Sequence, residues 1–212
     1  MRRAGPPVAR ASAGLVMLHG RGGSAADILS LLDHAGLQNV AAIAPEAPGH
    51  SWWPTSFLAP AADMAPYVDQ GLAAVDAALS ELEEEGLSRD RLWLLGFSQG
   101  ACLALEAFAR KGDGLAGVFG FSGGLVGLGD SGARSAALHG YADKSFYYEG
   151  RRGGRAWLSV HAQDPHIPLA RVERSASVLQ EMGAAVQLVI HPGTGHGILA
   201  ADMAALRGAL NG

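Results

Sequence analysis

The residues best suited to chemistry form the pentapeptide Gly96-Phe97-Ser98-Gln99-Gly100. A serine with a glycine two residues away on each side is typical of a nucleophile elbow, a tight turn between a strand and a helix that pushes the hydroxyl outward. Apolar runs over 91–95 and 101–105 supply the strand before it and the helix after it. The alternative is a Gly-rich turn that holds a serine by chance, and the surrounding runs favour the elbow.

A nucleophilic serine needs a base that takes its proton and a carboxylate that orients the base. When the serine lies on such an elbow, these partners are expected later in the chain, in the order carboxylate and then histidine. Asp164 follows an expected strand over 156–161, and His196 lies between two glycines after an expected strand over 185–190. We therefore expect Ser98 to be the nucleophile, His196 the general base and Asp164 the residue that orients it.

Other histidines and carboxylates could compete for these roles. His161 and His166 flank Asp164 in the sequence and are interpreted as positional or pocket residues, whereas His191 ends a strand and is interpreted as structural. Two further aspartates, Asp130 and Asp143, lie in an irregular segment and not at the end of a strand.

The sequence predicts neither a metal nor a cofactor. The eight histidines do not follow H-E-x-x-H or a comparable ligand spacing. The Gly-rich turn over 19–24 could in principle hold a phosphate, but it lacks G-x-G-x-x-G and the Walker lysine and serine. An H-G-x-G turn is better suited to donating a backbone N–H to an oxyanion. Cys102 is expected to serve packing.

The elements that must position these residues alternate along the chain. Apolar runs predict strands over 14–19, 39–44, 91–95, 115–121, 156–161 and 185–190. Helices are expected over 25–35 with Ser24 as N-cap, and over 68–82, 101–110, 169–182 and 198–210. This alternation predicts an α/β fold with a mostly parallel sheet covered on both faces, in a single domain over 1–212. Residues 1–12 are expected to form an extended lead-in.

Two irregular segments are candidates for the substrate pocket. The Pro-bounded, aromatic stretch 48–58 follows a strand end, where α/β proteins bind ligands. Its side chains could form a substrate wall or equally a lid on the core, and Trp52, Trp53 and Leu58 are the candidates for the wall. The Gly-rich segment 125–154 has no clear periodicity, and a loop of this length is usually functional or poorly ordered. Part of it is also expected to line the pocket.

Composition limits the class of protein. The chain has 212 residues, of which 49% are hydrophobic and 17% charged, which excludes a disordered chain. The net charge of −4 offers no basic surplus for nucleic acid. A single cysteine cannot form an internal disulfide, and neither a signal peptide nor a membrane-spanning run is recognisable. A cytoplasmic protein without stable membrane insertion is expected.

Five motifs in family order carry a resemblance to a known family. They are Leu18-His19-Gly20-Arg21-Gly22-Gly23, the stretch from Ala44-Pro45 to Trp52-Trp53-Pro54, Gly96-Phe97-Ser98-Gln99-Gly100, Asp164-Pro165-His166-Ile167-Pro168 and Gly195-His196-Gly197. The chain resembles the carboxylesterase/phospholipase branch of the α/β-hydrolases, which includes acyl-protein thioesterases. Two positions depart from the family pattern: Ala162 stands where glycine is usual, and His50 where asparagine is common.

The resemblance implies an α/β-hydrolase fold without a large cap domain, the Ser98–His196–Asp164 triad, and an oxyanion hole built from the backbone N–H groups of Arg21 and Gln99. It implies a serine carboxylesterase that acts on small ester or thioester substrates with short to medium acyl chains. The alternatives are an acyl-protein thioesterase or lysophospholipase, a peptidase or a dienelactone-type hydrolase on the same fold. A non-catalytic binding protein is a further alternative. The aromatic loop could equally serve a homodimer.

Overall fold

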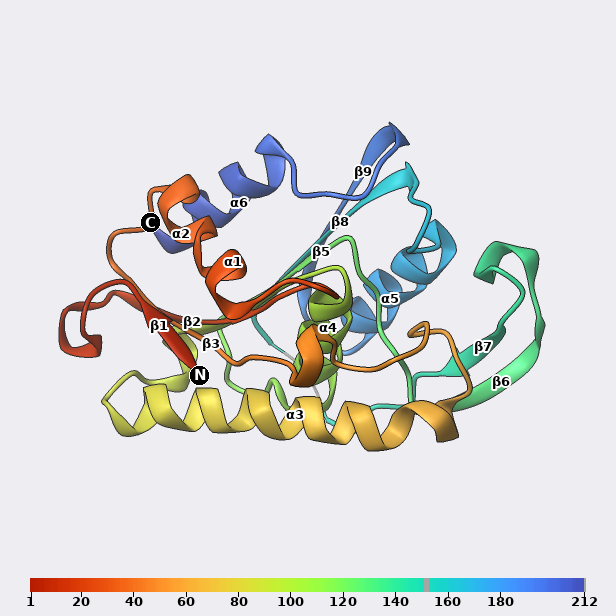
Figure 1. Ribbon diagram of the computed structural model, residues 1–212, viewed down its shortest axis with the longest axis horizontal. Coiled ribbons are helices and arrows are strands. Elements are labelled where there is room, and N and C mark those ends of the chain that lie inside the picture. The colour runs from red at the N-terminus through yellow and green to blue at the C-terminus, as the bar shows by residue number, and fades with distance from the viewer. Residues whose placement is uncertain (151–152, 212) are drawn as a thin grey trace.

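The computed structural model describes residues 1–150 and 153–211. Seven strands of this part form one sheet, in the order β1-β3-β2-β4-β5-β8-β9 (Figure 1). Only the pairing of β1 with β3 is antiparallel within this sheet, so the prediction of a mostly parallel sheet is confirmed. The strands are β1 (Arg2–Ala4), β2 (Ala13–Leu18), β3 (Val40–Ala44), β4 (Leu92–Phe97), β5 (Gly117–Phe121), β8 (Arg155–Gln163) and β9 (Ala185–Thr194).

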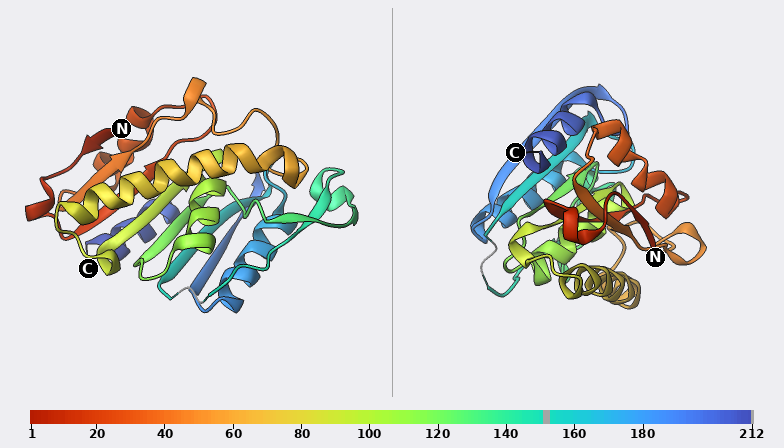
Figure 2. Two further views of the ribbon diagram at one scale, coloured as in Figure 1. Left: turned by 90° about the horizontal axis from the view of Figure 1, so that it is seen from below. Right: turned by 90° about the vertical axis from the view of Figure 1, so that its left-hand side faces the viewer.

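Helices cover both faces of this sheet, as the sequence predicted (Figure 2). One face packs against α3 (Ala61–Glu84), α4 (Gln99–Lys111) and α5 (Leu169–Glu181). The other packs against α1 (Ala25–Leu29), α2 (Leu31–Ala35) and α6 (Ala200–Leu210). Because both faces are covered, every residue of β2 and β3 is buried, which explains their continuous apolar runs.

Several boundaries differ from the sequence prediction. Residues 2–4, expected in a lead-in, form the edge strand β1, which pairs with β3. The helix expected over 25–35 is two short helices that meet at Ser30. Its predicted N-cap is present: the Ser24 hydroxyl accepts from the Asp27 N–H at 3.2 Å, and the Asp27 carboxylate accepts from the Ser24 N–H at 2.8 Å.

The segment expected to be irregular contains a small hairpin. Strands β6 (Gly129–Arg134) and β7 (Ala142–Ser145) pair antiparallel and project from the body of the molecule (Figure 1). The expectation of a long loop was wrong for this part, because β6 is almost fully exposed and carries no apolar alternation from which a strand could be recognised. Arg151 and Arg152, also part of that segment, lie outside the described residues.

The β6–β7 hairpin forms hydrogen bonds to the chain at the start of α3. The Lys144 ammonium donates to the Ala59 carbonyl at 2.6 Å and pairs with the Asp130 carboxylate. Asp130 in turn accepts from the backbone N–H of Ala61, the first residue of α3, at 3.1 Å. A carboxylate at a helix N-terminus satisfies a free N–H and complements the helix dipole. The hairpin thus fixes the chain just after the aromatic stretch.

A buried carboxylate on α4 anchors the chain that leads into and out of this hairpin. Glu106 is fully buried and accepts hydrogen bonds from the Arg110 side chain at 2.7 Å and from the Tyr148 hydroxyl at 2.8 Å. It also accepts from the backbone N–H groups of Val126 and Gly127, at 2.9 and 3.1 Å. Burial and the nearby Glu106 charge raise the pKa of the Tyr148 hydroxyl, which therefore stays protonated and donates.

Replacing Glu106 by alanine is expected to lower the free energy of unfolding by about 3–5 kcal/mol, because it removes the shared acceptor of two buried backbone N–H groups and of the Tyr148 hydroxyl. Replacing Tyr148 by phenylalanine removes a single donor and should cost about 1 kcal/mol. Urea unfolding followed by circular dichroism measures both values. A Glu106→Ala protein as stable as the wild type would contradict this role.

Candidate active site

Ser98 lies in the turn between β4 and α4 with φ 55° and ψ −119°, a conformation that non-glycine residues rarely adopt. The turn is tight on both sides. A Cβ on Gly96 would lie 2.1 Å from the Gly100 carbonyl oxygen, and a Cβ on Gly100 would lie 2.1 Å from the Leu18 carbonyl oxygen. Only glycine fits at these two positions, which is the physical reason for the Gly-x-Ser-x-Gly spacing.

Asp164 and His196 meet Ser98 at the carboxyl edge of the sheet, although they come from different strands. Asp164 follows β8, and His196 follows β9. The imidazole Nε2 of His196 lies 2.8 Å from the Ser98 hydroxyl, and its Nδ1 lies 2.8 Å from the Asp164 carboxylate. The three side chains named by the sequence therefore form one continuous hydrogen-bonded chain.

The Asp164 carboxylate is held in its charged form. Burial alone would raise its pKa, but the hydrogen bonds from His196 and from the backbone N–H groups of His166 and Ile167 outweigh burial. The pKa of Asp164 therefore lies below its usual range. An ionised Asp164 favours the proton of His196 on Nδ1, which leaves Nε2 free to accept the serine proton.

Two neighbouring rings hold the His196 imidazole in place. The ring of Phe97 lies 5.1 Å from it, and the ring of His166 meets it edge-on at 4.9 Å. His166 is thus a pocket residue, which is one of the two interpretations offered from the sequence. His161 and His191 are buried, lie opposite each other on β8 and β9, and have ring centroids 5.4 Å apart.

The two residues expected to form an oxyanion hole lie next to Ser98. Arg21 follows β2, and Gln99 is the first residue of α4, where a backbone N–H has no acceptor within the helix. Behind Arg21, the buried ring of His19 lies with Nδ1 2.8 Å from the Gly20 carbonyl oxygen, and its Nε2 accepts from the Ala47 N–H at 3.1 Å.

The side chains of Arg21 and Gln99, the two candidate oxyanion residues, form hydrogen bonds to the backbone of the aromatic stretch 48–58. The Gln99 amide accepts from the Trp52 N–H and donates to the Trp53 carbonyl, each at 2.8 Å. The Arg21 guanidinium donates to the Pro54 carbonyl at 2.9 Å and to the Thr55 carbonyl. The wall of the pocket is therefore hydrogen-bonded directly to the two residues beside Ser98.

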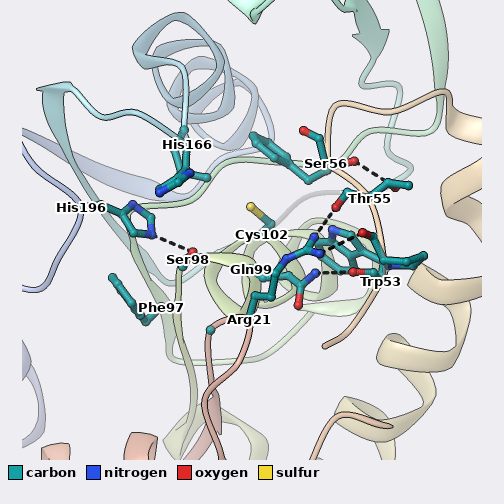
Figure 3. A pocket seen from close by; sticks show the side chains of 14 residues that line it. Arg21, Trp53, Thr55, Ser56, Phe97, Ser98, Gln99, Cys102, His166 and His196 are labelled. Carbon is teal, nitrogen blue, oxygen red and sulfur yellow. Dashed lines mark hydrogen bonds between the residues drawn. The ribbon is translucent and has the colours of Figure 1, made fainter. Parts of the chain in front are cut away.

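A cavity of about 550 Å³ opens at Ser98 (Figure 3). Of the three wall candidates from the sequence, only Trp53 lines it. The prediction was wrong for Trp52, whose indole N–H donates to the His19 carbonyl at 2.9 Å, and for Leu58, which is buried in the core. The wall is completed by residues that were not individually expected there, namely Pro54, Thr55, Ser56 and Phe57 of the candidate stretch 48–58, together with Phe97, Cys102 and Ile167.

The segment 125–154 contributes none of its described residues to this wall, so the expectation that part of it lines the pocket was wrong. Its effect is indirect, because Lys144 and Asp130 hold the chain at Ala59 and Ala61, just beyond Phe57. Cys102 is buried as expected, and it also borders the cavity. Burial raises the pKa of its thiol to about 12, so Cys102 stays a protonated thiol.

Two further observations concern the described chain as a whole. In the part of the chain that the structure describes, no group of three or more His, Cys, Asp or Glu side chains is arranged to hold a metal ion. No helix in residues 1–150 and 153–211 combines the length and apolarity needed to cross a membrane.

Known proteins resemble this chain in sequence and in fold. The family model described as phospholipase/carboxylesterase matches residues 5–144. A crystal structure of a phospholipase/carboxylesterase from Dyadobacter fermentans is 36% identical, with a TM-score of 0.84, over 100% of this chain and 95% of that one. Carboxylesterase structures from Mesorhizobium loti and Bacillus cereus share the fold at 19% and 15% identity, each with a TM-score of 0.70. They cover 97% and 99% of this chain, and 92% of their own. No match was found among curated proteins. The chain belongs to the phospholipase/carboxylesterase family of α/β-hydrolases.

Proposed function

We propose that this protein is a serine carboxylesterase that hydrolyses esters or thioesters of short to medium acyl chains through an acyl-enzyme intermediate. The observation that carries the proposal is the hydrogen-bonded chain from the Ser98 hydroxyl through His196 to Asp164, with 2.8 Å at each step. Nucleophile, base and orienting carboxylate in this arrangement are the groups that acyl transfer requires.

In the acylation step, the Ser98 oxygen attacks the ester carbonyl carbon while His196 Nε2 takes the hydroxyl proton. The carbonyl oxygen becomes an oxyanion and accepts from the backbone N–H groups of Arg21 and Gln99, a contribution of about 3 kcal/mol per donor. Asp164 stabilises the imidazolium that forms. His196 then gives its proton to the leaving oxygen or sulfur, and the alcohol or thiol departs.

Deacylation repeats these steps with water as the nucleophile. His196 takes a proton from the water as it attacks the acyl carbon, and the second tetrahedral oxyanion uses the same two N–H groups. Collapse of this intermediate breaks the bond to Ser98 and returns the proton to its oxygen. The products are the free carboxylic acid and the regenerated enzyme, with no net consumption of any protein group.

The cavity supports a preference for short to medium acyl chains. At about 550 Å³ it is of a size that holds a small molecule, and its wall includes the apolar side chains of Trp53, Phe57 and Ile167. Rates for 4-nitrophenyl esters with acyl chains from two to twelve carbons, with a matched thioester and anilide, test the proposal. Hydrolysis of the shorter esters and the thioester is expected, whereas cleavage of the anilide alone would overturn the proposal.

We expect the His19 side chain to orient the backbone N–H of Arg21, which is one of the two proposed oxyanion donors. Its Nε2 accepts from Ala47, so its proton is on Nδ1 and is donated to the Gly20 carbonyl. That carbonyl and the Arg21 N–H belong to one planar trans peptide and point in opposite directions. Fixing the Gly20 oxygen therefore fixes the direction of the Arg21 N–H.

A pair of substitutions tests this role. In His19→Asn the amide nitrogen can take the place of Nδ1 and keep the bond to Gly20, whereas His19→Gln keeps only an acceptor near Nε2. We expect the glutamine variant to have a kcat about tenfold below that of the asparagine variant, because a misaimed oxyanion donor loses transition-state stabilisation. KM should change little, and equal kcat values in two folded variants would contradict the role.

A further inference from the structure

The Arg21 side chain is pinned along one wall of the cavity. Its guanidinium donates to the carbonyl oxygens of Pro54 and Thr55, so the charged group is held against the stretch that carries Trp53 (Figure 3). An arginine at a protein surface usually retains considerable rotamer freedom, and ordering it costs free energy on binding. In this protein much of that ordering is already present before any ligand arrives.

The charge of Arg21 is not balanced by an acid. Its two partners are neutral carbonyls, and among residues 1–150 and 153–211 no carboxylate lies within ion-pair distance of it. None of the described residues lining the cavity is an aspartate or a glutamate. The nearby Asp164 carboxylate is engaged by His196 and by two backbone N–H groups.

Arg21 also keeps hydrogen-bonding capacity. A guanidinium carries five N–H donors, and the two carbonyls account for one donor on each terminal nitrogen. The remaining donors can form charge-assisted bonds to a carboxylate, which are about twice as strong as bonds between neutral groups. The wall of the cavity therefore presents a fixed cation that could bind an anionic group of the substrate.

The geometry of the reaction indicates whether the acyl chain or the leaving group of the substrate lies near the Arg21 guanidinium. His196 must reach the leaving oxygen to protonate it, so the leaving group lies on the His196 side of Ser98. In Figure 3, Arg21 extends from the Ser98 region toward Trp53 and Thr55, away from His196. The acyl chain, which lies on the other side of the reacting carbon, is therefore the part that runs toward the guanidinium.

We propose that Arg21 selects acyl groups that end in a carboxylate, so that half-esters of dicarboxylic acids are preferred substrates. This inference rests on the proposed esterase function and specifies its substrate class. The chemistry is unchanged: water cleaves the acyl–oxygen bond, the alcohol leaves with a proton, and the product is the dicarboxylic acid. The terminal carboxylate takes no part in bond making and only binds Arg21.

The test compares substrates that differ in charge but hardly in shape. The monomethyl esters of glutarate, adipate and pimelate are each paired with the neutral analogue whose free carboxyl is a primary amide. In the wild type, kcat/KM for the best acid is expected to exceed that for its amide by about tenfold or more, the range of a charge-assisted bond. The advantage should shrink as ionic strength rises, because Arg21 is exposed and salt screens a solvent-exposed pair.

Arg21→Met and Arg21→Lys provide the matched variants. The ratio of acid to amide is compared within each variant, so that any general loss from the broken bonds to Pro54 and Thr55 cancels. Methionine should bring the acid-to-amide ratio to about one. Lysine should retain part of the preference, because its ammonium keeps the positive charge but lacks the paired N–H donors of the planar guanidinium. A ratio that stays unchanged in Arg21→Met would overturn the inference.

A second pair places the carboxylate on the alcohol. Hydrolysis of 4-acetoxybenzoate and of its neutral amide should show no charge preference. A preference found only in this pair would overturn the assignment of Arg21 to the acyl side. Wild-type hydrolysis of the neutral esters with an acid-to-amide ratio of one or less would overturn the inference alone, whereas absence of hydrolysis for every ester would count against the proposed function itself.

Discussion

Replacing Ser98 by alanine is expected to reduce kcat for ester hydrolysis about a millionfold while the protein stays folded. The loss should be this large because the Ser98 hydroxyl is the nucleophile that lies at the imidazole, 2.8 Å from His196 Nε2, in the part of the chain that the structure describes, and burial keeps the nearby Cys102 as a protonated thiol. Stopped or continuous assays with 4-nitrophenyl butyrate, together with the circular dichroism spectrum of the variant, measure the effect.

Ser122 provides the matched control. It lies at the end of the neighbouring strand β5, is buried, and has a positive φ of 52°, close to the 55° of Ser98. Its hydroxyl contacts the Gly197 carbonyl at 3.5 Å rather than the imidazole. Ser122→Ala should therefore retain most of its activity. An equal loss in both variants would mean that a general disturbance of the sheet edge, and not removal of the nucleophile, explains the result.

Replacing Asp164 by asparagine is expected to lower kcat by about 10⁴, the effect of presenting the imidazole in the wrong tautomer. The asparagine amide can donate to Nδ1, which would put the histidine proton on Nε2, where it blocks proton transfer from Ser98. The bonds from the His166 and Ile167 N–H groups can still be accepted by the amide oxygen, so the turn should survive. A folded Asp164→Asn protein with near-normal kcat would contradict the role of the carboxylate.

The same variant has a predictable effect on stability. The pKa of Asp164 is lowered in the folded protein, so its ionised form stabilises the fold above the unfolded-state value of about 3.9. That contribution is lost as the pH falls through the lower folded-state value. The difference in unfolding free energy between wild type and Asp164→Asn should be constant above about pH 5 and shrink below about pH 4. Urea unfolding across this range measures it.

The sequence predicted well which candidate side chains meet at the sheet edge, because the position of each depends on a local rule. Gly96 and Gly100 are required by backbone contacts 2.1 Å from a hypothetical Cβ, so their spacing marks the elbow without any knowledge of the fold. Asp164 and His196 follow strands whose apolar runs are continuous or nearly so. Parallel strands bring their carboxyl ends to one edge, and this alone brings the residues into proximity.

The sequence predicted the pocket less well because nothing periodic determines which way a side chain points in an irregular segment. Trp52 and Trp53 are neighbours, yet only Trp53 borders the cavity. The side-chain amide of Gln99, from a different part of the chain, sets their orientation. It accepts from the Trp52 N–H and donates to the Trp53 carbonyl. Phe57 lines the cavity and Leu58 enters the core, a difference of one residue that depends on tertiary packing.

The hairpin was missed for a different reason. β6 and β7 are short, and β6 is polar and exposed along nearly its whole length, so the alternation that marks a half-buried strand is missing. Its stability comes from contacts distant in sequence, such as Lys144 with the Ala59 carbonyl and Tyr148 with Glu106. Long-range contacts of single side chains leave no pattern in a sequence.

Ser98 is the proposed nucleophile, activated by His196. The most direct measurement is reaction of the native protein with a fluorophosphonate, followed by intact mass and peptide mapping. We expect a single adduct on Ser98, formed far more slowly in Asp164→Asn and absent from Ser98→Ala. An adduct on another residue, or undiminished ester hydrolysis by a protein that the reagent does not modify, would contradict it.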